Sequence, residues 1–183
     1  MPVLAAWVGP PLRDSFAELL GTADPSLIDE ALALYRDRFA TDGMFENVVY
    51  PDVRDGLMRL GETGHQSWVV TSKPHVYARA ILTHFDLLQM FVGVYGSELS
   101  GERADKAALL GHVLDVEGRD GRTCMVGDRR HDVAGAHANG LEAIGVLWGY
   151  GSRAELEEAG AEVLVASMSE LVEWAGRSSG GWG

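Results

Sequence analysis

The first fifty residues carry apolar side chains at helical spacing and almost no pattern typical of strands. One helix face is formed by Leu12, Phe16, Leu19 and Leu20, and another by Ile28, Leu32, Tyr35 and Phe39. Gly21 is expected to end the first helix, and Asp24-Pro25 to cap and begin the second. The sequence therefore predicts a small all-helical segment over residues 1–50, with a connector over residues 41–51.

From about residue 51 short apolar runs alternate with helical patterns. The predicted strands cover residues 67–71, 92–95, 123–126, 143–147 and 163–165. The predicted helices cover residues 53–63, 74–85, 104–115, 132–139, 152–159 and 169–175. This alternation is typical of an α/β fold with a Rossmann-like, mainly parallel sheet and helices on both faces. We expect this core over residues 51–176 and a flexible tail over residues 177–183.

Composition and charge narrow the classes of protein. The chain has 183 residues, 46 % of them apolar, and its formal charge is 15 − 27 = −12. Such an acidic chain is a poor partner for nucleic acid or for an anionic membrane. The apolar runs are too short to span a membrane, and no signal peptide is recognisable. The lone Cys124 fits a reducing cytoplasm, and the sequence leaves a homo-oligomer open.

Hydroxyl groups follow the first predicted strand. Thr71 and Ser72 stand where that strand ends, and Lys73-Pro74 leads into the next helix. Because ligands of parallel sheets bind at the carboxyl ends of strands, these groups are candidates for an anion site at a helix N-terminus. The alternative is a threonine or serine that only caps a helix.

Two acids and one lysine occupy comparable positions. Asp128 and Asp132 flank the end of the strand over residues 123–126, where carboxylates could bind a hard cation such as Mg²⁺. Their alternative is helix capping. Lys106 begins a helix, a position that the helix dipole disfavours, although it could equally be a solvated surface lysine. Together these groups could surround one phosphate and one Mg²⁺.

Three segments, in order, resemble motifs of the haloacid dehalogenase superfamily, in its phosphoglycolate phosphatase-like branch. Val69-Val70-Thr71-Ser72-Lys73-Pro74 resembles the second motif, and Arg103-Ala104-Asp105-Lys106 the third. Met125-Val126-Gly127-Asp128-Arg129-Arg130-His131-Asp132 resembles the fourth, Gly-Asp-x-x-x-Asp. The helical first fifty residues resemble part of the cap domain of such enzymes.

The resemblance implies a Mg²⁺-dependent phosphatase that acts on a small phosphomonoester through an aspartyl-phosphate. Its implied phosphate contacts are Thr71, Ser72 and Lys73, its charge-neutralising lysine is Lys106, and its metal ligands are Asp128 and Asp132, with Asp132 acting through water or orienting Lys106. Arg13, in the expected cap, is a further candidate contact to substrate. Phosphoglycolate, a nucleoside monophosphate or another small phosphomonoester would fit.

The first motif of the family, Asp-x-Asp-x-Thr, is absent, since no two aspartates in the chain are two positions apart. The family's nucleophile and general acid/base belong to this motif, which lies on a central strand. The sequence therefore predicts a chain that begins inside the cap and has a gap in its sheet. Three interpretations stay open: a phosphatase from an incomplete reading frame, an inactive phosphate- or Mg²⁺-binding domain, and a fold completed by another chain.

Two further side chains have plain interpretations. His131 is expected to be a solvated helix residue rather than part of the site. Cys124 lies within a predicted strand and is expected to be a buried, unreactive thiol.

Overall fold

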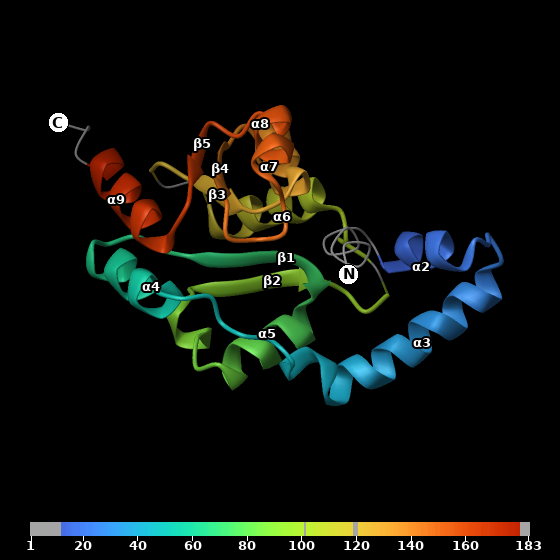
Figure 1. Cartoon of the computed structure of the whole chain (residues 1–183). Coiled ribbons are helices and arrows are strands. Elements are labelled where there is room, and N and C mark those ends of the chain that lie inside the picture. The colour runs from blue at the N-terminus through green and yellow to red at the C-terminus, as the bar shows by residue number, and fades with distance from the viewer. Residues whose placement is uncertain (1–11, 101, 119–120, 180–183) are drawn as a thin grey trace. The chain divides into compact units, whose positions relative to one another are not determined.

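The computed structural model describes residues 12–100, 102–118 and 121–179, and it is shown in Figure 1. The chain divides into two compact units, residues 1–48 and residues 49–183, and each is described by itself. None of the described helices is long and apolar enough to cross a bilayer.

The first unit contains the two predicted helices, α2 (Leu12–Leu20) and α3 (Pro25–Thr41), followed by the short 3₁₀ helix η1 (Gly43–Phe45). Asp24 caps α3 by accepting a hydrogen bond from the Ser26 N–H at 2.9 Å. The helices meet through aromatic rings, because Phe16 lies edge-on to Tyr35 with 5.9 Å between ring centroids. Tyr35 in turn stacks on Phe39 at 5.4 Å.

The second unit alternates strands and helices, as the sequence predicts. Its strands are β1 (Trp68–Pro74), β2 (Gly93–Ser97), β3 (Cys124–Gly127), β4 (Glu142–Val146) and β5 (Val163–Val165). Its helices are α4 (Val53–Glu62), α5 (His75–His84), η2 (Leu88–Met90), α6 (Lys106–Glu117), α7 (Arg130–Ala138), α8 (Arg153–Ala159) and α9 (Met168–Ser179).

All described strand pairs are parallel, which confirms the predicted α/β class. The strands nevertheless form two sheets. One has the order β1-β2 and the other the order β3-β4-β5, and among the described residues no strand pairs with both β1 and β3. The single sheet that the sequence predicts is therefore divided into two sheets in this structure.

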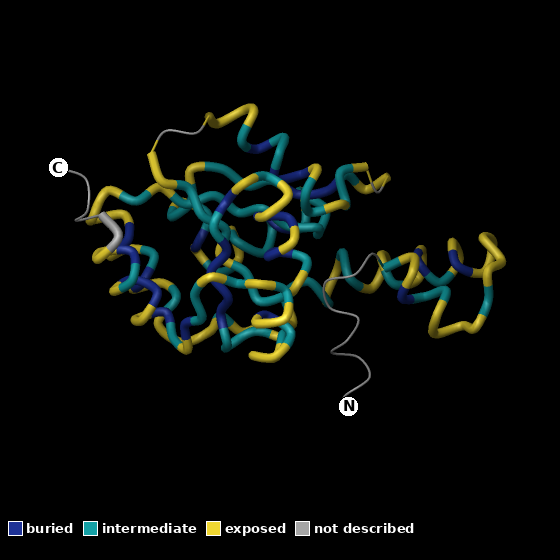
Figure 2. Tube along the Cα trace, turned by 90° about the horizontal axis from the view of Figure 1, so that it is seen from above, coloured by how far each residue is buried: buried dark blue, intermediate teal, exposed yellow. Residues whose placement is uncertain are grey.

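Helices cover both faces of the larger sheet. The cluster on the α4/α9 side consists of Leu60, Ile144, Val146, Val165, Met168, Leu171, Val172 and Ala175. The cluster on the α6/α7/α8 side consists of Leu110, Val133, Ala136, Leu141, Ala143 and Leu156. Successive residues of β4 alternate between these clusters, and buried positions in this unit gather where helices meet strands (Figure 2).

Several predicted boundaries are wrong. Pro74 ends β1 instead of opening the next helix, and α6 begins at Lys106 because Asp105 caps it by accepting from the Ala108 N–H at 2.8 Å. Helix α7 begins at Arg130, before the predicted start, because the Asp132 carboxylate accepts from the Arg129 N–H at 3.2 Å. The expected tail begins too early, since residues 177–179 still belong to α9, while residues 180–183 lie outside the described residues.

Candidate functional site

Thr71, Ser72 and Lys73 lie in the carboxyl-terminal half of β1, with Thr71 at the middle of the strand. The Thr71 hydroxyl accepts a hydrogen bond from the Lys73 N–H at 3.2 Å, and the Ser72 carbonyl accepts one from the Ser97 hydroxyl at 2.8 Å. The second contact ties the end of β1 to the end of β2. Lys73 is partly buried, and this burial lowers the pKa of its ammonium.

Lys106 connects β1 to the first turn of α7. Its ammonium donates to the Val70 carbonyl at 2.9 Å and forms an ion pair with Asp132 Oδ1, also at 2.9 Å. The two charged side chains are only 12 % and 13 % exposed. Lys106 is therefore not the solvated surface lysine that the sequence allowed, and it lies beside the residue that precedes Thr71.

Two glycines make room for this ion pair. A Cβ at Gly127 would lie 2.2 Å from the Asp132 Cβ, and a Cβ at Gly135 would lie 2.7 Å from the Lys106 Cγ. These separations are too short for any side chain larger than a hydrogen atom. Glycine at both positions thus lets the Asp132 carboxylate and the Lys106 stem pass close to the backbone.

Asp128 is enclosed by the loop after β4. Its Oδ2 accepts from the Tyr150 N–H at 2.7 Å, and a Cβ at Gly149 would lie 2.3 Å from that same oxygen. Tyr50, in the connector before α4, lies close enough to the Asp128 carboxylate for the two groups to interact electrostatically. Burial raises the pKa of Tyr50, and the neighbouring Tyr150 and Asp128 raise it further.

The donor chemistry of this edge fits Mg²⁺. That cation keeps several waters and typically binds one or two carboxylates. Asp128 is held by a backbone donor and can supply a direct oxygen ligand, whereas both oxygens of Asp132 are engaged, by Lys106 and by the Arg129 N–H. The part of the chain that the structure describes has no group of three or more His, Cys, Asp or Glu side chains that could hold a metal. The fit is therefore to a hydrated ion on Asp128, with Asp132 directed at Lys106.

Sequence reasoning missed the supports of this arrangement. The Asn139 amide donates to the Ala107 carbonyl at 2.9 Å and to the Gly135 carbonyl at 2.8 Å, which joins the start of α6 to α7. The Arg129 guanidinium pairs with Glu155 at 2.9 Å beneath the loop. The Asn139–Ala107 and Arg129–Glu155 contacts leave no local signal, because their partners lie more than twenty residues apart.

Arg13 lies in the first unit, where its guanidinium pairs with Asp29 at 2.7 Å. Both side chains are about half exposed, so this contact fits an ordinary surface ion pair. Its role as a substrate contact stays a prediction.

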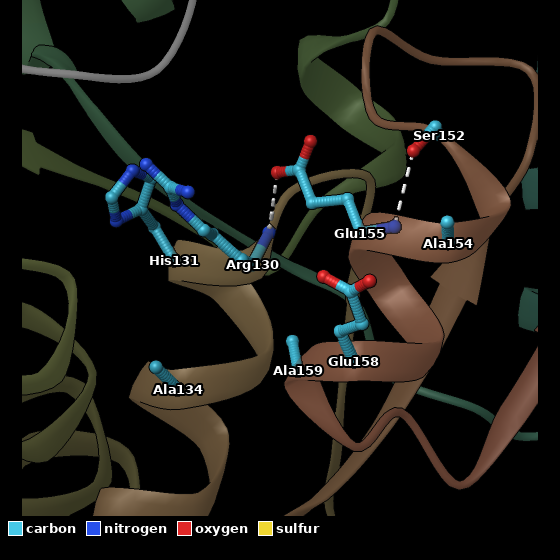
Figure 3. Close-up of a pocket in the computed structure, with 8 residues that line it drawn as sticks. All are labelled: Arg130, His131, Ala134, Ser152, Ala154, Glu155, Glu158 and Ala159. Atoms are coloured by element: carbon cyan, nitrogen blue, oxygen red, sulfur yellow. Dashed lines mark hydrogen bonds between the residues drawn. The ribbon is translucent and has the colours of Figure 1, made fainter.

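His131 differs from the expectation of a solvated residue. Its ring is partly buried, and its Nε2 is fully buried without a hydrogen-bond partner within the described part of the chain. Figure 3 shows this ring beside the Arg130 side chain at the start of α7. Both residues line a cavity of about 560 Å³ between α7 and α8. Alanines 134, 154 and 159 line the cavity together with Glu155 and Glu158, which turn toward its interior.

Cys124 behaves as the sequence predicts. The thiol is partly buried in β3, and desolvation by burial raises its pKa to about 11. Nearby Glu142 also raises it, and Arg122 acts in the opposite direction. The thiol is therefore protonated and unreactive at neutral pH.

The residues in and after β1 and β3 thus include a lysine paired with a carboxylate, a second carboxylate and two hydroxyls, and groups of these kinds suit phosphate chemistry. Residues 3–146 match the family of haloacid dehalogenase-like hydrolases. The chain belongs to this family, as the sequence motifs predict.

Its relatives include several phosphatases. A 5′-nucleotidase of Pseudomonas aeruginosa is 44 % identical over 154 residues, which are 84 % of this chain and 69 % of that protein. The phosphoglycolate phosphatase of Pseudomonas putida is 30 % identical over 81 % of this chain and 55 % of its own length. The tyrosine-protein kinase PtkA of Mycobacterium tuberculosis is 33 % identical over 92 % of this chain and 58 % of its own length. The chain therefore spans little more than half the length of the last two.

The solved structures agree on the fold. A predicted phosphatase from Clostridium acetobutylicum superposes with a TM-score of 0.89 at 38 % identity, covering 95 % of this chain and 81 % of that one. About a fifth of the solved chain consequently has no counterpart among these residues.

Proposed function

We propose that this chain forms the phosphate- and Mg²⁺-binding part of a phosphatase that hydrolyses a small phosphomonoester through an aspartyl-phosphate. The nucleophilic aspartate is not among its 183 residues, which contain no Asp-x-Asp pair. The observation that carries the proposal is the buried Lys106–Asp132 ion pair, which holds an ammonium beside the end of β1. A nucleoside monophosphate is the favoured substrate class, because the 5′-nucleotidase is the more similar of the two phosphatase relatives described above.

Each residue has a distinct part in this proposal. The Thr71 and Ser72 groups at the end of β1, with Lys73, would bind phosphate oxygens. Lys106 would neutralise charge on the phosphoryl group, and Asp132 would hold the Lys106 ammonium in place. Asp128 would bind Mg²⁺, which when bound supplies additional positive charge next to the phosphate.

The overall charge of −12 does not exclude an anionic substrate. Charges on a protein surface are screened within about 8–10 Å at physiological salt, so a small ligand responds mainly to the groups that touch it. Here those groups are the two lysines and the backbone N–H groups at the strand ends. Local contacts, rather than the field of the whole chain, would bind the phosphate.

A second candidate is a phosphate- or Mg²⁺-binding domain without turnover. The absence of Asp-x-Asp favours it, because a covalent phosphatase of this family needs that pair. The two candidates share the same ligands and differ only in whether product is released.

Two measurements on the full chain separate them. The first is release of phosphate from adenosine monophosphate, phosphoglycolate and an aryl phosphate in the presence of Mg²⁺, and the second is the thermal shift caused by Mg²⁺ with inorganic phosphate. Asp128→Asn should abolish the effect of Mg²⁺, whereas Asp115→Asn, on the exposed side of α6, should not. A thermal shift without turnover supports the binding domain. Absence of both effects in a folded sample contradicts both candidates.

A further inference from the structure

The loop that encloses Asp128 holds Tyr150 between two glycines. A Cβ at Gly149 would overlap the Asp128 carboxylate, and a Cβ at Gly151 would overlap the Asp128 carbonyl oxygen, so neither position can carry a side chain. The Tyr150 N–H donates to Asp128 Oδ2 at 2.7 Å. The backbone of Tyr150 is therefore fixed one hydrogen bond away from the residue to which the proposed function assigns Mg²⁺.

The other side chains of residues 148–152 have structural parts. Trp148 packs against the core cluster on the α4/α9 side, and the Ser152 hydroxyl caps α8 by accepting from the Glu155 N–H at 3.1 Å. The Tyr150 side chain, by contrast, is 58 % exposed. Within the described part of the chain its ring stacks on no other ring, and its hydroxyl forms no hydrogen bond. Packing and capping thus explain Trp148 and Ser152 but not the Tyr150 ring.

The hydroxyl end of Tyr150 lies toward the site. Tyr50, in the connector before α4, is 43 % exposed, and burial raises its pKa, as do the neighbouring Tyr150 and Asp128. Negative groups raise the pKa of a phenol only when they are close to it. The two phenol groups and the Asp128 carboxylate therefore share one neighbourhood, in which two partly exposed aromatic rings adjoin the proposed cation ligand.

We propose that Tyr150 determines specificity for a nucleoside monophosphate by stacking its ring on the base. This role rests on the proposed function, which places the phosphate and Mg²⁺ beside Asp128, and it adds the group that recognises the leaving part of the substrate. One ribose separates the base from the phosphate, so a phosphate held there leaves the base within reach of the surrounding side chains. Aromatic rings bind every base, because every base has a π-face. A substrate without a ring, such as phosphoglycolate, would gain nothing from Tyr150.

Ligand affinities of the full chain test the proposal. Adenosine monophosphate, ribose 5-phosphate and inorganic phosphate are each titrated in the presence of Mg²⁺, and the first two differ chiefly in the base. Adenosine monophosphate should bind about tenfold more tightly than ribose 5-phosphate, a ratio that corresponds to about 1.4 kcal/mol and is typical of one base stacked on an aromatic side chain.

Matched variants assign this preference to the ring. Tyr150→Leu should reduce the tenfold ratio to about one without changing the affinity for ribose 5-phosphate, because it removes the ring and keeps the backbone contact to Asp128. Tyr150→Phe should keep the ratio, since it removes only the hydroxyl. Val116→Ala is the control, because Val116 is a similarly exposed apolar residue, at 57 %, on α6.

Proton NMR of adenosine monophosphate gives a second readout. The ring current of a stacked aromatic side chain moves the adenine H2 and H8 resonances upfield. The upfield shift should appear with the unmodified chain and with Tyr150→Phe, and it should be absent with Tyr150→Leu. A purely structural part for Tyr150 would instead weaken the binding of all three ligands together.

Three results would overturn the proposal. Equal affinities for adenosine monophosphate and ribose 5-phosphate, in a chain that binds inorganic phosphate, would show that the base is not recognised, while the proposed function would stand. Loss of the preference in Tyr150→Phe would assign it to the hydroxyl instead of the ring. If none of the three ligands binds to a folded sample, the proposed function fails, and the part of Tyr150 fails with it.

Discussion

Replacing Lys106 with methionine should destabilise the second unit strongly. Methionine keeps the apolar stem and removes the ammonium. The Asp132 carboxylate then stays buried with the Arg129 N–H, at 3.2 Å, as its remaining described donor. The Val70 carbonyl loses the Lys106 donor as well.

The magnitude follows from burial. Removing one partner of a buried ion pair leaves an uncompensated charge, at a cost of about 3–5 kcal/mol. The paired side chains are 12 % and 13 % exposed, which places this pair in the buried class. The double variant Lys106→Met/Asp132→Asn removes both charges and should recover most of the loss. In contrast, Arg153→Met breaks a pair whose side chains are 59 % and 56 % exposed and should cost less than about 1 kcal/mol.

Urea unfolding followed by circular dichroism measures the free energy of unfolding. The single variant Lys106→Met, the double variant Lys106→Met/Asp132→Asn and the control Arg153→Met are each compared with the unmodified chain. Equal denaturant slopes would show that each variant changes the free energy of unfolding rather than the residual structure of the unfolded chain. If Lys106→Met costs no more than Arg153→Met, or if the double variant is as unstable as the single one, the ion pair is not the buried contact described above.

Three further outcomes are expected. Gly135→Ala should cost about 1–3 kcal/mol and reduce the phosphate-induced thermal shift, because its Cβ would meet the stem of Lys106, whereas Gly176→Ala, with open space in α9, should be neutral or stabilising. Cys124, with its pKa raised to about 11, should react with Ellman's reagent at pH 8 far more slowly than free cysteine; an equal rate would contradict its burial. Partial burial raises the pKa of Glu155, but hydrogen bonds from the Arg129 side chain and the Arg130 N–H outweigh it and lower the pKa below its ordinary 4.5. The ionised Glu155 carboxylate therefore stabilises the folded state above pH 4.5, and this stabilisation is lost as the pH falls through the lower pKa of the folded state. Glu155→Gln should consequently make the free energy of unfolding less pH-dependent below pH 4.5.

The order of strands and helices could be predicted from the sequence because local patterns determine it. Lys106, Asp128 and Asp132 could be named as candidates for a related reason: each stands just after a strand or in the first turn of a helix, whereas Thr71 lies within β1, which continues to Pro74. Topology then brings such positions to one edge of parallel sheets. The first and last residues of helices and strands were harder to predict. Helix α6, for example, begins where Asp105 accepts a hydrogen bond from the Ala108 N–H, and the sequence pattern does not show which nearby polar residue will form such a cap.

The contacts that support the site could not be predicted in the same way. The Asn139 side chain joins α6 to α7 by donating hydrogen bonds to two backbone carbonyls. Because every residue type has a backbone carbonyl, the sequence does not show which residues will accept these bonds. The sequence likewise does not show that a side chain at Gly127 or Gly135 would overlap Asp132 or Lys106, because glycine also occurs for many other reasons. The division of the strands into two sheets was not predicted, because the missing motif indicated only a gap within one sheet.

The structure also favours one of the two parts that the sequence left open for Asp132. Both oxygens of Asp132 accept hydrogen bonds, one from Lys106 and one from the Arg129 N–H, which is the arrangement expected of a carboxylate that orients the lysine. This contact also offsets the unfavourable placement of a lysine in the first turn of α6, where the helix dipole repels a cation. Asp132 thus compensates both the unfavourable helix dipole at Lys106 and the removal of the Lys106 ammonium from water, and this stabilising part does not depend on a bound metal. In the proposed function the two aspartates of the Gly-Asp-x-x-x-Asp segment would therefore have different parts: Asp128 would bind the cation, and Asp132 would hold the lysine.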